Sequence, residues 1–171
     1  RLIIILICFC AAGAAFAQTP VEKVITKYAG TKGSKDFIAS GGEMILARSL
    51  IRKTPLAAIA PDVDVLEVLK MQNAPDDILN DFEKDLKAAL ASYDYYGKTQ
   101  GKNGLVNIYI TRSGEDIIDE LVIYNPEIHS VNSLKGTISA TKLQKLDPEC
   151  HPKNGQFTDE THLFPAAIRK K

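Results

Sequence analysis

Two of the three histidines and one cysteine lie close together in the stretch from Glu149 to His162. Cys150 and His151 are adjacent, and His162 follows eleven residues later. Thiolates and imidazoles are the ligands that zinc and copper favour in proteins. A zinc site usually takes four ligands with paired spacings, however, and adjacent Cys and His do not fit that pattern. We therefore expect no metal or cofactor here, with metal or thiol handling by this tail as the alternative.

Five tyrosines form a second group of side chains that could contact a ligand. Tyrosine rings stack on sugars and on peptide side chains, and their hydroxyl groups form hydrogen bonds at contact surfaces. The alternative is that these tyrosines are half buried at the edge of a sheet, as tyrosine often is. The sequence thus indicates a candidate binding surface that consists of Tyr93, Tyr95, Tyr96, Tyr109 and Tyr124.

No local sequence pattern indicates catalysis. The chain has no G-x-S-x-G nucleophile elbow, no H-E-x-x-H zinc motif and no C-x-x-C pair. Asp77, Asp81 and Asp85 are spaced to share one helical face, but acidic residues are also typical of a solvated helix, which we favour. We expect a protein that is not an enzyme. Because triad members need not be close in sequence, an envelope hydrolase with a non-local triad is the alternative.

The N-terminal segment has the composition of a secretory signal peptide. Arg1 precedes an apolar run over residues 2–10, and small residues follow up to an Ala-Phe-Ala sequence that ends at Ala17. The run is too short to form a stable membrane span. We therefore expect residues 1–17 to be a signal peptide that is cleaved after Ala17, and the protein to be exported to the periplasm or the extracellular space.

The charge and the cysteine content restrict the partners that we expect. The chain has 21 basic and 21 acidic residues, and such a balance is not typical of proteins that bind nucleic acid or anionic membranes. Neither Cys8 nor Cys10 follows a small residue, so we do not expect lipid anchoring. After cleavage Cys150 would be the single thiol, either free or linked to another chain. The partner that we expect is an envelope protein or a small ligand.

Several segments have the signals of helices. Thr19 and Glu22 have the spacing of a capping box, and Ser40 and Glu43 repeat that spacing before a second helix. A third helix over residues 76–92 has the clearest pattern, since its apolar residues recur at helical spacing. A last helical turn is predicted over residues 141–146. The apolar face of the third helix comprises Ile78, Leu79, Phe82, Leu86, Ala89 and Leu90.

After residue 92 the pattern changes to the alternation that is typical of strands, with turn residues between the strands. Earlier strands are predicted over residues 37–40 and 62–71. We therefore expect one α+β domain over residues 18–146, with an antiparallel meander sheet of four to five strands and two to three helices packed on one face. Residues 147–171 are predicted to form a flexible tail. The third helix should pack on the sheet face that carries Val106, Ile108, Leu121 and Ile123.

Two short motifs and the order of the elements resemble a known family. Lys27-Tyr28-Ala29-Gly30 and Lys135-Gly136-Thr137-Ile138 fit the opening and closing motifs of the domain-of-unknown-function family numbered 4252. Its members are small exported or lipid-anchored proteins of Bacteroidetes-type bacteria. The resemblance covers about residues 21–146 and implies an envelope setting with a link to envelope sensing. The family has no agreed catalytic residues, so none is carried over. Together these features predict an exported, non-catalytic binding or accessory protein.

Overall fold

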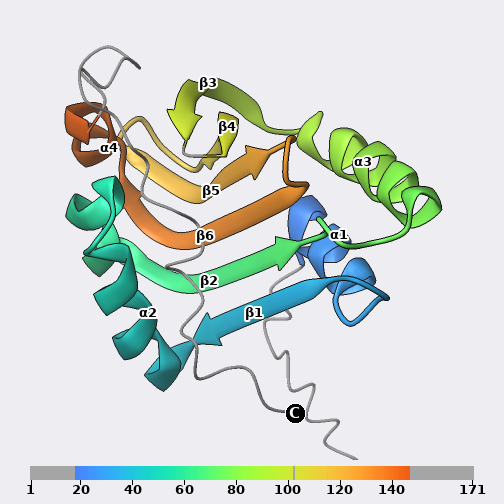
Figure 1. Ribbon diagram of the computed structural model, residues 1–171. Helices are drawn as coiled ribbons and strands as arrows, with labels where there is room; N and C mark the ends of the chain where they lie inside the picture. Colours follow the sequence, from blue (N-terminus) through green and yellow to red (C-terminus); the bar gives the residue numbers. More distant parts are fainter. Residues whose placement is uncertain (1–17, 102, 147–171) are drawn as a thin grey trace, which may run out of the picture.

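The computed structural model describes residues 18–101 and 103–146, which form one open antiparallel sheet with helices on both sides (Figure 1). The expected signal peptide, residues 1–17, lies outside the described residues. The expected tail, residues 147–171, does so too, together with Cys150, His151 and His162. No helix within the described ranges is both long and apolar enough to cross a membrane.

Within the described ranges, the sheet has six strands in the order β1-β2-β6-β5-β4-β3, and all neighbouring strands are antiparallel. The last four strands form the predicted meander, and β2 and β1 extend it beyond β6. The prediction of an antiparallel α+β sheet is thus confirmed, although with more strands than the four to five expected. The strands are β1 (Lys35–Ser40), β2 (Val63–Lys70), β3 (Asp94–Gly101), β4 (Gly104–Arg112), β5 (Ile117–Asn125) and β6 (Ser130–Ser139).

In the described part of the chain, four α-helices accompany the sheet, one more than the upper limit expected. They are α1 (Pro20–Tyr28), α2 (Met44–Ile51), α3 (Asp76–Leu90) and α4 (Ala140–Leu146). The predicted capping box of Thr19 and Glu22 is present at the start of α1. The predicted box of Ser40 and Glu43 is wrong, because Ser40 is the last residue of β1 and its side chain caps nothing. A 3-10 turn, Gly41–Glu43, separates it from α2.

One face of the sheet, which we call the α2–α4 face, packs against α2, α4 and the 3-10 turns that follow α2. Its strand residues alternate with those of the opposite face, as the pleat of a sheet requires. Met44 and Ile51 of α2 and Leu143 of α4 are buried against it. The strand residues of this core include Leu66, Val68, Val106, Ile108, Ile110, Leu121, Ile123 and Leu134.

The opposite face, which we call the α1–α3 face, packs against α1 and α3. Phe82, Leu86 and Leu90 of α3 are buried in a second core with Val122 of β5 and Val131 of β6. The predicted apolar stripe of α3 therefore packs against the sheet, with half of its residues fully buried, but on the face opposite to the one expected. Packing of all helices on one face is likewise wrong. Figure 1 shows α1 and α3 at one side of the sheet and α2 and α4 at the other.

The reason for both errors lies in the run Leu121-Val122-Ile123-Tyr124 of β5. Leu121 and Ile123 point to one face of the sheet, and Val122 and Tyr124 point to the other. A strand that is covered on both faces has a nearly continuous apolar sequence, in contrast to the alternation of a half-exposed strand. The sequence prediction took only the first pair as core, and so it needed only one layer of helices.

Candidate ligand-binding face

Tyr95 and Tyr109 form an aromatic pair on the α1–α3 face, near the outer edge of the sheet. They are directly opposite each other in the register of β3 and β4. Their ring centroids are 5.4 Å apart and the planes are inclined by 66°, which is an edge-to-face arrangement. Tyr95 is 56% exposed, whereas Tyr109 is half buried beneath it and packs against the core of this face. The ring of Tyr95 is thus exposed to solvent, and the ring of Tyr109 supports it from the side of the core.

Tyr124 continues this row towards α3. It lies diagonally across from Tyr109, because Tyr109 pairs with Val122 in the register of β4 and β5. Burial, the charge of Glu83 and the neighbouring Tyr109 raise the pKa of Tyr124 to about 12. The Tyr124 hydroxyl therefore stays protonated at neutral pH. Tyr95, Tyr109 and Tyr124 together form what we call the tyrosine row.

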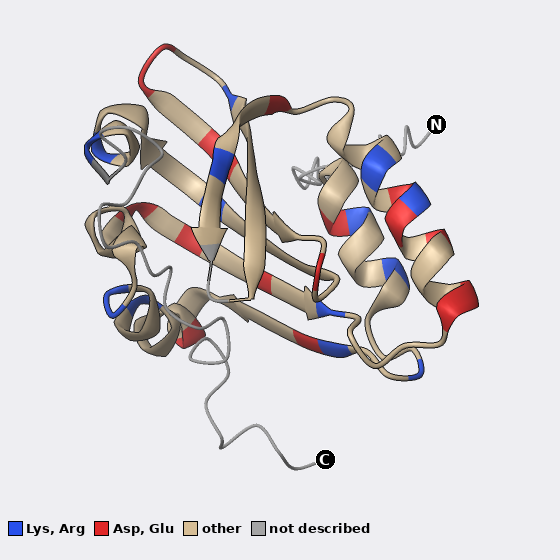
Figure 2. Ribbon diagram, turned by 45° about the horizontal axis from the view of Figure 1, so that its top comes forward, with Lys and Arg blue, Asp and Glu red and all other residues tan. Residues whose placement is uncertain are grey.

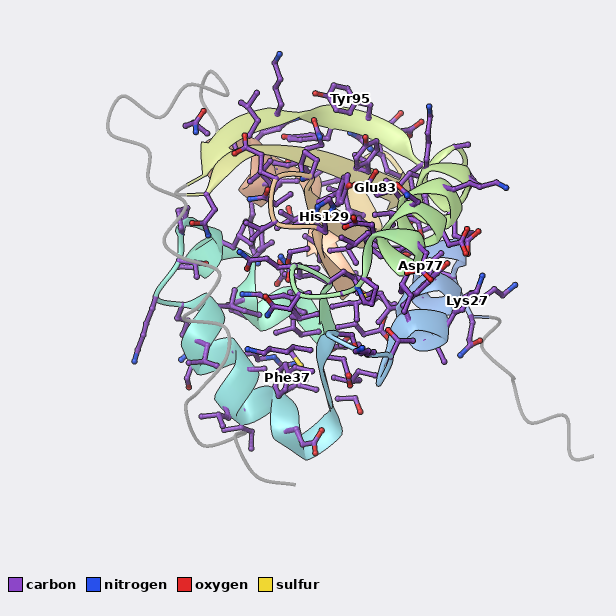
Figure 3. All side chains as sticks on the ribbon, turned by 45° about the vertical axis from the view of Figure 1, so that its right-hand side comes forward. Lys27, Phe37, Asp77, Glu83, Tyr95 and His129 are labelled. Carbon is purple, nitrogen blue, oxygen red and sulfur yellow. The ribbon has the colours of Figure 1, made fainter. Side chains whose placement is uncertain are left out.

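A close contact between α3 and the β5–β6 turn borders the tyrosine row. The Nδ1 atom of His129 lies 2.7 Å from Oε1 of Glu83, and both side chains are partly exposed (Figure 3). His129 has φ of 47°, an uncommon value for a residue other than glycine. Its carbonyl oxygen accepts a hydrogen bond from the backbone N–H of Met71. This bond fixes the strained turn, and with it the position of the imidazole beside α3.

The other two predicted tyrosines do not join the row. Tyr93 is buried, and its hydroxyl group donates a hydrogen bond to Glu120. Burial, followed by the hydrogen bond to Glu120, raises the pKa of Tyr93. Tyr96 packs partly buried against the core of the α2–α4 face. Of the five candidate residues, the structure brings three together and places the other two elsewhere.

A buried polar cluster beneath α1 was not predicted from the sequence. Glu120 of β5 is only 1% exposed, yet three hydroxyl groups donate hydrogen bonds to its carboxylate. Ser133 Oγ lies 2.6 Å from Oε1, Thr19 Oγ1 lies 3.2 Å from the same oxygen, and Tyr93 donates to Oε2. Buried carboxylates need such partners, because an unpaired buried charge is strongly destabilising. The cluster therefore satisfies Glu120 within the protein.

Lys135 of β6 extends this cluster to two further carboxylates. Its ammonium group lies 2.7 Å from Oε2 of Glu22 in α1 and 2.9 Å from Oε2 of Glu67 in β2. The contact with Glu67 is an ion pair without hydrogen-bond geometry, since that oxygen has no hydrogen-bond partner. Burial alone would lower the pKa of Lys135, but Glu22 and Glu67 outweigh it and raise that pKa.

The polar cluster positions α1 on the sheet. Two of its members, Thr19 and Glu22, form the capping box at the start of α1, while the others belong to three different strands and to the residue before β3. At the far end of α1, Tyr28 and Lys27 both bond to Asp85 of α3. Tyr28 also contacts Phe82 edge to face. The helix is thus fixed at both ends, and Asp85 serves a contact between helices.

No group of three or more His, Cys, Asp or Glu side chains that could hold a metal ion occurs in the described part of the chain. His129 is the one histidine within that part, and it pairs with Glu83. The candidate ligands Cys150, His151 and His162 lie outside it, so the alternative of a metal-handling tail stays a prediction.

The fold and the site define a class: an α+β protein whose open antiparallel sheet carries a half-exposed tyrosine row beside a histidine–glutamate pair. Comparison of the chain with protein-family models, curated proteins and solved structures finds no match. The resemblance to family 4252 stays a prediction. Functional arguments therefore rest on the geometry of the chain itself.

Proposed function

We propose that the protein is an exported, non-catalytic binding protein that holds a sugar-bearing component of the cell envelope on its tyrosine row. The observation that carries this proposal is the exposed ring of Tyr95, which rests on the ring of Tyr109. The signal-like N-terminus and the resemblance to an exported family support the envelope setting. The absence of a catalytic motif in the sequence supports a binding role.

The chemistry of the row suits a sugar ring. The C–H faces of a pyranose stack on aromatic rings, and tyrosine adds a hydroxyl group that exchanges hydrogen bonds at the rim. Glu83 and His129 are partly exposed beside Tyr124 and could bond to sugar hydroxyl groups. The base of the row is preorganised, because Tyr109 and Tyr124 are held by the core of the α1–α3 face. Preorganised side chains lose little conformational entropy on binding.

The proposal is tested with the full chain and a panel of soluble oligosaccharides and peptidoglycan fragments, with binding measured by calorimetry. Tyr95→Ala should weaken the best ligand about tenfold, which corresponds to ~1.4 kcal/mol. Tyr95→Phe should retain most of the affinity, because stacking needs the ring. Ile117→Ala removes a similarly exposed apolar side chain at the other end of β5 and should change nothing.

Two results would count against the proposal. One is that no member of the panel binds, while a protein from envelope extract binds equally to the native chain and to Tyr95→Ala. The other is turnover of a bound sugar, which would indicate a hydrolase. In that case Glu83→Gln and His129→Ala would lower the rate rather than the affinity.

A further inference from the structure

The helix α2 has two large apolar side chains on its exposed face. Ile45 is 74% exposed and Leu46 is 58% exposed, although Met44, Ala47 and Ile51 of the same helix are buried. Isolated exposed apolar residues are common, but two adjacent ones on a short helix form a patch that needs explanation.

Exposed cations lie on the same side of α2. At 100° per residue, an arc of about 120° includes Ile45, Leu46, Ser49 and Arg52, and Lys53 follows in the turn after the helix; all five are exposed. Arg52 continues the helical conformation as the C-terminal cap, and its backbone N–H bonds to Arg48. The exposed face therefore has apolar side chains in its first turn and cations at its end.

Two of the acidic groups near α2 are paired with cations. Arg48 pairs with Asp64 at 3.1 Å, and Lys142 of α4 pairs with Asp62 at 2.8 Å. Across the described residues, Arg52 and Lys53 form no ion pair, and Glu43 is the acidic residue next to the apolar pair. Figure 2 shows both basic and acidic segments on the side of the sheet that α2 and α4 cover. Arg52 and Lys53 thus leave a small excess of positive charge at the C-terminal end of α2, although the net charge of the chain is zero.

From these observations we propose that the exposed face of α2 docks on an anionic lipid surface. A short amphipathic helix can lie in the plane of the membrane interface, with apolar side chains inserted and cations at the level of the headgroups. Juxtaposed Lys and Arg residues are attracted by anionic lipids, and each contributes measurably to binding. The positive excess at Arg52 and Lys53 favours this occupant over a second copy of the chain, whose corresponding face would be basic as well.

The proposal is independent of the sugar-binding proposal, since α2 and the tyrosine row lie on opposite faces of the sheet. The balanced overall charge of the chain indicated no anionic membrane as partner. The proposal differs from that expectation, because a local excess of cations is sufficient for docking at a surface. The protein would be peripheral to the membrane through this helix.

The test measures partition of the full chain between buffer and vesicles of 30% phosphatidylglycerol in phosphatidylcholine, with pure phosphatidylcholine for comparison. Any contribution of residues 1–17 is common to all variants. The double variant Arg52→Gln/Lys53→Gln should lower the partition onto anionic vesicles about 30-fold. The matched control Lys84→Gln/Lys87→Gln removes two exposed cations from α3 instead, and should change partition by less than about twofold.

The second variant, Ile45→Ser/Leu46→Ser, removes exposed side chains and should leave the thermal unfolding temperature unchanged while it weakens partition. Equal loss in both charge variants would show that only total charge matters, and would overturn the proposal. Equal partition of all proteins would do the same. A native dimer that Ile45→Ser/Leu46→Ser converts to a monomer, without any effect on vesicles, would assign this face to a second copy.

Discussion

Glu67 and Glu120 are both buried on the α1–α3 face, but their surroundings differ. Glu120 accepts three hydrogen bonds from hydroxyl groups, whereas Oε2 of Glu67 has, among the described residues, only the contact with Lys135, which Glu22 shares. Desolvation raises the pKa of Glu67, and the nearby ammonium group of Lys135 offsets this shift only in part. We therefore expect the protonation of Glu67 to affect the stability of the protein more than that of any other residue in the cluster.

The direction of the pKa shift fixes the effect on stability. A carboxyl group with a higher pKa in the folded state binds its proton more tightly there than in the unfolded chain. Its contribution to stability is complete below the ordinary pKa of glutamate, near 4.5, and is lost as pH rises through the raised value. Glu67 should thus make the native protein less stable at neutral pH than at mildly acidic pH.

Glu67→Gln should remove this dependence. Urea unfolding at several pH values between 4.5 and 8 should show the variant gaining free energy of unfolding relative to the native protein as pH rises. The exposed Glu115→Gln serves as control and should give a constant difference. A difference for Glu67→Gln that is constant, or that falls with pH, would show that Lys135 keeps Glu67 charged in the folded state.

The partners of these residues could not be read from the sequence. Glu67 and Glu120 each stand within apolar strands, and a charged residue in such a strand is a signal of a buried polar contact or of an exposed face. Both residues are buried because α1 covers them, and the sequence does not indicate this contact, since Glu120 is 101 residues away from Thr19. Tyr95 and Tyr109, by contrast, are opposite each other across a predicted hairpin, so their proximity follows from the turn between them.

At the scale of an element, the helix α3 shows which structural features a local sequence pattern can predict. Its start and its apolar stripe follow from helical periodicity and agree with the prediction, although the helix ends at Leu90 and not at Ser92. The face of the sheet on which it packs does not follow, because β5 offers an apolar surface on both sides. The choice depends on chain connections: α3 joins β2 to β3 and pairs with α1, whose apolar side needs the same cover.

Phe82→Ala should be the most destabilising single truncation in α3. Phe82 is fully buried and contacts Tyr28 of α1 edge to face, at a centroid distance of 5.5 Å. The change leaves a cavity between two helices and the sheet, with an expected loss of about 3–5 kcal/mol in the free energy of unfolding. Urea unfolding measures this loss, with Ile45→Ala as the exposed control, for which we expect a change within about 0.5 kcal/mol. A loss below about 1 kcal/mol for Phe82→Ala would show that the helix contributes little to the core.

At the scale of the whole molecule, one sheet separates two cores. β2, β5 and β6 contribute side chains to both, so loss of either core would expose one face of the same strands. An antiparallel sheet can face water on one side, which makes separate melting of the α1–α3 layer conceivable in principle. Here the exposed face would contain Leu69, Val122 and Val131 together with the buried carboxylates of Glu67 and Glu120. The sheet is therefore unsuited to lose either layer alone, and we expect a single cooperative transition.

The two methionines of the chain report separately on the two cores, since Met44 is buried in the α2–α4 core and Met71 in the α1–α3 core. With labelled methyl groups, their native NMR signals should disappear at the same urea concentration. Phe82→Ala should lower the midpoints of both signals equally, although this variant truncates only the α1–α3 core. Met44→Leu and Met71→Leu assign the signals, and cost less than about 1.5 kcal/mol as volume-conserving changes. Earlier loss of the Met71 signal would instead make α1 and α3 a layer that unfolds by itself, so that the tyrosine row would open independently of the α2 face.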